Sequence, residues 1–86
     1  EISGDSMEPR VNNGSIALIK QADILDDGHI GAFYYDGAVF CKIFRKTKTE
    51  AFLESVNKKY SPIHLAENAS FKIYGEVIAV LNSVNH

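Results

Sequence analysis

The feature of this sequence that most constrains its fold is the Asp36-Gly37 dipeptide, which lies between two short apolar runs. An Asp-Gly pair readily adopts the positive φ angles that a two-residue hairpin turn requires. We therefore expect the runs at residues 29–35 and 38–45 to form antiparallel strands that pair with each other.

Similar turn signals separate the other apolar runs, none of which has a helical period. These signals are Asn12-Asn13-Gly14, Asp26-Asp27-Gly28 and Thr47-Lys48-Thr49. Pro62 keeps residues 57–62 out of a central strand, so we expect a loop there. The sequence predicts further strands at residues 15–20, 50–55 and 71–81. The expected fold is mostly β: one small, twisted, barrel-like domain of antiparallel hairpins over residues 1–86.

The run at residues 71–81 alternates with a period of two. We assign to one face Phe71, Ile73, Val77, Ala79 and Leu81, and to the other Lys72, Tyr74, Glu76, Ile78 and Val80. Because neither face is a polar row, this strand needs cover on both sides, which a second copy would supply in so small a domain. We therefore expect a homodimer with this strand near its two-fold axis.

The composition limits the function classes. With 45% hydrophobic and 23% charged residues, the 86-residue chain has the composition of one ordinary globular domain. A formal net charge of −2 argues against a nucleic-acid-binding face. No apolar run approaches the roughly 18 residues of a membrane span, and no leader-like segment opens the chain. We expect a cytoplasmic protein without a membrane partner.

The cysteine and histidine content indicates neither a disulfide nor a metal site. Cys41 is the single cysteine, which excludes an internal disulfide. The histidines His29, His64 and His86 lack the spacing of metal ligands, so we expect them at the surface. No metal or other cofactor is expected.

The segment at residues 3–9 places Ser6 on a turn. Gly4 permits a positive φ angle, and Pro9 biases the residue before it away from helical geometry. We expect a short strand, then a sharp turn that exposes the Ser6 hydroxyl. Most serines on turns are only turn residues, so chemistry at Ser6 requires a partner.

Lys42 is the candidate partner, because it interrupts an apolar strand on the face that carries Phe40 and Phe44. One interpretation is an edge-strand lysine whose ammonium reaches water along its own stem. The other is a lysine among aromatic rings, where desolvation lowers the pKa and produces a general base. A serine with such a base is the Ser-Lys variant of the serine-hydrolase arrangement.

These residues resemble the LexA-type serine peptidases, which include self-cleaving bacteriophage repressors. The resemblance lies in Gly4–Pro9 (Gly-Asp-Ser-Met-Glu-Pro), Asn13-Gly14-Ser15, Asp27-Gly28-His29 and Lys42-Ile43, with Lys42 36 residues after Ser6. It extends to Asn57, Tyr60, Pro62-Ile63 and Tyr74-Gly75-Glu76-Val77, so it covers essentially the whole chain.

The resemblance implies a serine endopeptidase with a LexA-type fold and a Ser-Lys dyad. Ser6 would be the nucleophile and Lys42 the general base. The backbone N–H groups of Asp5 and Ser6 would form the oxyanion hole. We expect the Asp5 carboxylate to cap the turn rather than to act as a triad acid.

The resemblance also implies partners. Such domains usually follow a helix-turn-helix DNA-binding domain, dimerise, and cut their own interdomain linker when RecA on single-stranded DNA stimulates them, as in the SOS response. The chain contains no Ala-Gly or Cys-Gly dipeptide, the bond that the family usually cuts. We therefore expect the linker and the operator-binding domain to lie outside these residues.

Two alternatives remain at this stage. The domain could keep the dyad but serve as a dimerisation module or as the target of an antirepressor protein. It could also be a relative of signal peptidases, although the missing membrane anchor and the small domain count against this.

Overall fold

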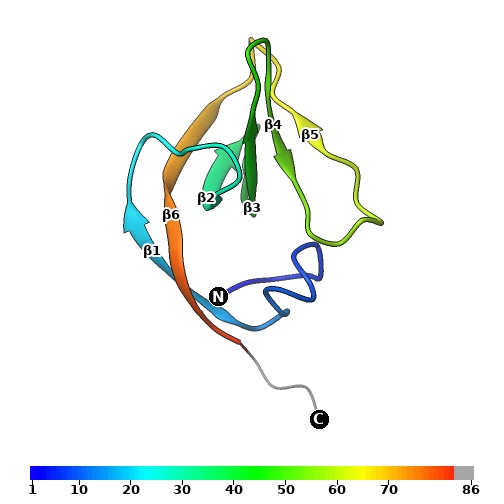
Figure 1. Ribbon diagram of the computed structural model, residues 1–86, viewed down its shortest axis with the longest axis vertical. Coiled ribbons are helices and arrows are strands. Elements are labelled where there is room, and N and C mark those ends of the chain that lie inside the picture. The colour runs from blue at the N-terminus through cyan, green and yellow to red at the C-terminus, as the bar shows by residue number, and fades with distance from the viewer. Residues whose placement is uncertain (83–86) are drawn as a thin grey trace.

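The computed structural model describes residues 1–82, which form one curved antiparallel sheet (Figure 1). The strands are β1 (Ile16–Gln21), β2 (Ile30–Tyr35), β3 (Ala38–Lys46), β4 (Ala51–Glu54), β5 (Ile63–His64) and β6 (Phe71–Leu81). Their order across the sheet is β1-β6-β2-β3-β4-β5. The prediction of a mostly β fold is confirmed. Among the described residues, the one strand that was not predicted is the short edge strand β5, which begins directly after Pro62.

The hairpin between β2 and β3 forms as predicted. Asp36 and Gly37 both have positive φ angles, 48° and 92°, and Tyr35 pairs with Ala38 across the turn. The positive φ angles allow a two-residue connection whose twist matches that of the strands. This hairpin fixes the register of β3, the strand that carries Lys42.

Strand β6 pairs with β1 on one side and with β2 on the other. Its register shifts twice, so that Tyr74 is skipped in the pairing with β2 and Ile78 in the pairing with β1. A bulge of this kind interrupts the alternation of side chains. The expected single face from Phe71 to Leu81 is therefore wrong: Phe71 packs against the core, whereas Leu81 is 63% exposed.

The main core consists of aromatic and aliphatic side chains from the middle of the sheet. Its buried members are Leu25, Phe33, Phe44 and Leu53. The ring of Phe33 lies 5.9 Å from the rings of both Phe44 and Phe71, between centroids. Close packing of this kind holds β2, β3 and β6 together and makes the strands a rigid support.

The N-terminal segment closes the lower end of the sheet in Figure 1, between β1 and the loop that follows β4. Ile2 exchanges backbone hydrogen bonds with residues 14 and 15, of 2.8 and 2.7 Å, but the expected short strand before the turn does not form. Met7 and Val11 are almost fully buried. The serine turn is thus held before Ser6 by the backbone of Ile2 and after it by two buried apolar side chains.

The remaining points concern single residues and membrane-spanning helices. His29 and His64 are exposed, as predicted, and His86 lies outside the described residues. Cys41 is a free thiol. No helix in the described part of the chain has the length and apolar character needed to span a membrane.

Candidate active site

The turn that carries Ser6 is held by its own backbone and by Asn13. Gly4 has a φ angle of 88°, in the region that favours glycine, and its N–H donates to Asn13 Oδ1 at 2.8 Å. Glu8 N–H donates to the Asp5 carbonyl at 3.1 Å. Because the neighbouring Met7 side chain is buried, Ser6 is half-buried rather than exposed as expected. Its hydroxyl lies in a pocket rather than at the surface.

Lys42 is a buried residue of an interior strand. β3 lies between β2 and β4, so the interpretation of Lys42 as an edge-strand lysine is wrong. Only 6% of Lys42 is exposed. Its Nζ donates a 2.7 Å hydrogen bond to Ser55 Oγ and lies 5.9 and 5.5 Å from the ring centroids of Phe40 and Tyr60.

The surroundings of Lys42 change how it titrates. Burial penalises the ammonium form and lowers the pKa of Lys42 below its ordinary value, an effect that Cys41 opposes weakly. Burial likewise raises the pKa of the Cys41 thiol, against the nearby Lys42 charge. A lysine with a lowered pKa has a larger neutral fraction near neutral pH, which is what a general base needs.

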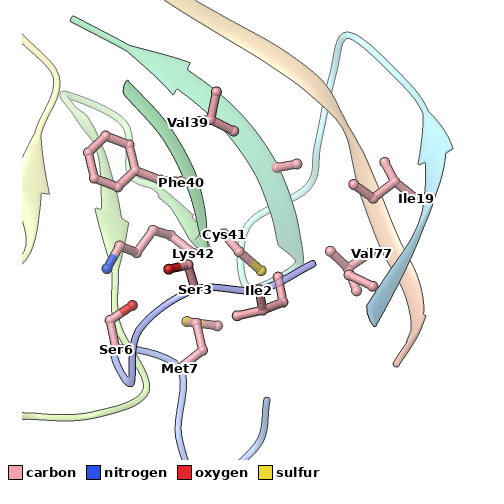
Figure 2. A pocket seen from close by; sticks show the side chains of 12 residues that line it. Ile2, Ser3, Ser6, Met7, Ile19, Val39, Phe40, Cys41, Lys42 and Val77 are labelled. Carbon is pink, nitrogen blue, oxygen red and sulfur yellow. The ribbon is translucent and has the colours of Figure 1, made fainter. Parts of the chain in front are cut away.

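Ser6 and Lys42 line the same cavity of about 210 Å³. Figure 2 shows the Ser6 hydroxyl and the Lys42 Nζ at one side of this cavity, with the oxygen turned toward the nitrogen. The remaining lining is mostly apolar and includes Ile2, Met7, Ala17, Ile19, Ala32 and Val77. A second cavity of about 400 Å³, also lined by Ser6 and Lys42, extends toward Tyr60 and Ile63. Ser6 and Lys42 therefore line both cavities, which together offer space for an extended chain.

The loop after β4 contacts both candidate residues, which the residue patterns did not predict. Ser55 is buried and accepts the Lys42 hydrogen bond. Asn57 donates through its backbone N–H to the Ser6 carbonyl at 2.9 Å and through Nδ2 to the Asp5 carbonyl at 3.1 Å. Asn57 was noticed only through the family resemblance, whereas no signal in the sequence marks Ser55.

The Asp5 carboxylate also contacts this loop. It accepts hydrogen bonds from the Tyr60 hydroxyl and, at 2.8 Å, from the Lys59 ammonium. The hydrogen bond from Lys59, followed by that from Tyr60, lowers the pKa of Asp5. The same contacts with Asp5 raise the pKa values of Lys59 and Tyr60. The prediction of a local turn cap missed this role, in which Asp5 ties the serine turn to a distant loop.

The chain matches a known protein family over most of its length. A model of the family described as Peptidase S24-like matches residues 1–78. The chain therefore belongs to the Peptidase S24-like family, a serine peptidase family, and the resemblance to LexA-type peptidases is confirmed.

Similar curated proteins carry the name LexA repressor. Those of Carboxydothermus hydrogenoformans, Leptospira interrogans and Mycolicibacterium smegmatis are 34%, 36% and 28% identical to this chain over 83, 63 and 85 residues. The matches cover 93%, 72% and 98% of the chain. The chain spans only 40%, 31% and 34% of the lengths of these relatives.

Proposed function

We propose that this chain is the catalytic and dimerisation domain of a LexA-like repressor, and that it acts as a Ser-Lys endopeptidase on its own interdomain linker. The observation that carries the proposal is the buried Lys42, with its lowered pKa, on the cavity that also holds Ser6. Membership of the Peptidase S24-like family and the names of the relatives support it.

In the proposed reaction, the neutral Lys42 amine removes the proton from Ser6 as Oγ attacks the carbonyl carbon of the scissile peptide. The resulting Lys42 ammonium then donates this proton to the leaving amine, and the C–N bond breaks. Water attacks the acyl-enzyme with Lys42 again as the base, which regenerates Ser6. In the structure Lys42 Nζ donates to Ser55 Oγ, so the proposed proton transfer from Ser6 requires Lys42 to turn its lone pair toward the cavity that both residues line.

The backbone N–H groups of Asp5 and Ser6 are the proposed donors to the developing oxyanion. Donors of this kind act in a water-poor site, where they stabilise the charged intermediate more than in water. The anchoring of the turn by Met7 and Asn13 supports this role, because donors that are already fixed need no rearrangement during the reaction.

The cavity favours a substrate with small apolar side chains. Ala17, Ala32 and Ile19 line it, and within residues 1–82 no charged group other than Lys42 does. A linker with an Ala-Gly bond between apolar residues has this chemistry. We keep two further points as predictions. The inducer is either RecA on single-stranded DNA or an antirepressor, and operator DNA is bound through another domain.

The test is cleavage in trans of a peptide that carries an Ala-Gly bond with apolar flanks. We expect slow cleavage that accelerates from pH 7 to 10 as Lys42 loses its proton. Ser6→Ala should abolish cleavage and leave the fold intact, since one turn hydroxyl contributes little to the core. The proposal fails if Ser6→Ala cleaves as fast as the parent protein.

The outer face of β1 and β6 supports the dimer. Ile16 pairs with Leu81 and Leu18 with Ala79, and these side chains are exposed, Ile16 by 51%. Ile78, which bulges out of the same pair of strands, is 60% exposed. A second copy would remove this apolar surface from water.

Sedimentation of the parent protein and of Leu18→Glu tests the dimer. We expect the parent to form dimers at micromolar concentration and the variant to remain a monomer. A 9.5 kDa monomer for the parent protein at high micromolar concentration would remove the dimer from the proposal.

This same face supports the alternative in which the domain dimerises without cutting. Its apolar residues do not depend on Ser6, so dimerisation could persist where cleavage does not occur. A full-length protein whose linker stays intact under inducing conditions, while its dimer forms normally, would favour this alternative.

A further inference from the structure

The hydrogen bonds of Asn57 converge on the turn that carries Ser6. Asn57 Nδ2 donates to the Asp5 carbonyl at 3.1 Å, and the Asn57 backbone N–H donates to the Ser6 carbonyl at 2.9 Å. One residue thus binds two consecutive carbonyl groups on a segment about fifty positions earlier in the chain.

The Asp5 carbonyl and the Ser6 N–H belong to one peptide unit. A peptide unit is planar, and in its trans form the C=O and N–H bonds point in opposite directions. A donor that fixes the direction of the Asp5 carbonyl therefore also fixes the direction of the Ser6 N–H. This N–H is a proposed oxyanion donor, and its usefulness depends on its direction.

The Asn57 side chain is itself oriented by its own loop. Its Oδ1 accepts a 3.2 Å hydrogen bond from the Lys59 N–H, and its carbonyl accepts one of 3.2 Å from the Tyr60 N–H. With Oδ1 occupied in this way, the NH₂ group faces the Asp5 carbonyl. A carboxylate in the same place would set an oxygen against that carbonyl and repel it.

We propose that Asn57 is a positioning residue that sets the direction of the Ser6 N–H in the oxyanion hole. This inference rests on the proposed peptidase function. A role only in shaping its own loop would explain the bonds from Lys59 and Tyr60, but not the donation from Nδ2 across to Asp5.

The kinetic test uses Asn57→Asp, with Asn68→Asp in the exposed turn before β6 as the matched control. We expect Asn57→Asp to lower kcat for the Ala-Gly peptide about 10- to 100-fold, somewhat less than complete loss of an oxyanion donor. KM and the pH midpoint should stay as in the parent, because the substrate cavity and Lys42 are unchanged. The control should keep the parent kcat. An unchanged kcat in Asn57→Asp, or a loss accompanied by a shifted pH midpoint, would overturn the inference.

Backbone ¹⁵N relaxation gives a readout that needs neither turnover nor a complete active site. In Asn57→Asp and Asn57→Ala, the order parameter of the Ser6 amide should fall from about 0.85 toward 0.6 or lower, while amides of β2 and β3 stay rigid. A Ser6 amide as rigid as in the parent would overturn the inference even if the peptide were not cleaved. By contrast, if Ser6→Ala still cleaves the peptide as the parent does, the proposed function is overturned. The order parameter of the Ser6 amide then still decides whether Asn57 positions the Ser6 N–H.

Discussion

Two lysines near the serine turn share one aromatic neighbour, Tyr60, yet their environments shift their pKa values in opposite directions. Lys42 Nζ is 5.5 Å from the centroid of the Tyr60 ring, and Lys59 Nζ is 5.4 Å from the same centroid. Burial lowers the pKa of Lys42, whereas the Asp5 carboxylate raises the pKa of Lys59. The shared ring is therefore not the main determinant of either pKa.

The two lysines are suited to different roles. Lys59 is exposed and paired with a carboxylate, which suits a group that holds the turn in place. Lys42 is buried and hydrogen-bonded to a neutral hydroxyl, and it forms no ion pair within residues 1–82. A buried ammonium with only a neutral partner gives up its proton more easily, which suits a base.

The largest expected effect is on cleavage. Lys42→Ala should reduce the rate of peptide cleavage on the order of 10³-fold or more, because the proposed base is removed. Lys59→Ala should change it by no more than about threefold, as is usual for a surface substitution. Initial rates at pH 9 measure both. Equal losses of cleavage rate in Lys42→Ala and Lys59→Ala would contradict the distinction between Lys42 as the proposed base and Lys59 as a residue that holds the turn.

The second effect concerns the hydroxyl that binds Lys42. Ser55→Ala leaves the buried Nζ without its acceptor, which should lower the free energy of unfolding by about 1–3 kcal/mol. Because that hydrogen bond favours the charged form, its loss should also lower the pKa of Lys42 and move the pH-rate midpoint to lower pH. Urea denaturation and a pH-rate profile measure these changes, with the exposed Ser70→Ala as control. A midpoint that moves to higher pH would contradict this role for Ser55.

A smaller effect appears in stability as a function of pH. With the folded pKa of Lys42 lowered, the penalty for burying its charge is fully present below the folded pKa. The penalty declines as pH rises from there toward the unfolded value of about 10.4. The free energy of unfolding of the parent should therefore rise relative to that of Lys42→Met over this window. A constant difference in urea denaturation between pH 7 and 10 would mean that the pKa is not lowered.

The smallest expected effect belongs to the exposed pair. The folded pKa of Asp5 is lowered, so its contribution to stability is present above its unfolded pKa of about 3.9 and is lost as pH falls through the folded pKa. Asp5→Asn should lower Tm slightly at pH 7, and the difference should vanish in acid and shrink in 1 M salt. A difference that is independent of both salt and pH would show that the carboxylate does not act through its charge.

The strands were predictable because their signals are local. The Asp36-Gly37 turn and the apolar runs contain the information for the β2–β3 hairpin within a few residues. The two bulges of β6 were not predictable, because they arise from pairing with two neighbours in different registers. The assignment of Leu81 to the same face as Phe71 was wrong for that reason.

In the candidate site, too, some residues were predictable from local patterns and others were not. Ser6 and Lys42 were identified from a turn motif and from a charge in an apolar strand. Ser55, by contrast, is an ordinary serine after a short strand. Its role depends on its hydrogen bond with Lys42, which forms only when the chain has folded. The contacts of Asp5 with Lys59 and Tyr60 also join segments more than fifty residues apart, which no local pattern encodes.

The most direct test of the account is an NMR titration of the lysine side chains in the parent protein, with Lys42 and Lys59 assigned by substitution. We predict that Lys42 titrates below the ordinary lysine pKa of about 10.4 and that Lys59 titrates above it. Because both groups are followed in one sample, each serves as the reference for the other. A Lys42 pKa at or above that of Lys59 would contradict the claim that burial makes Lys42 the base beside Ser6.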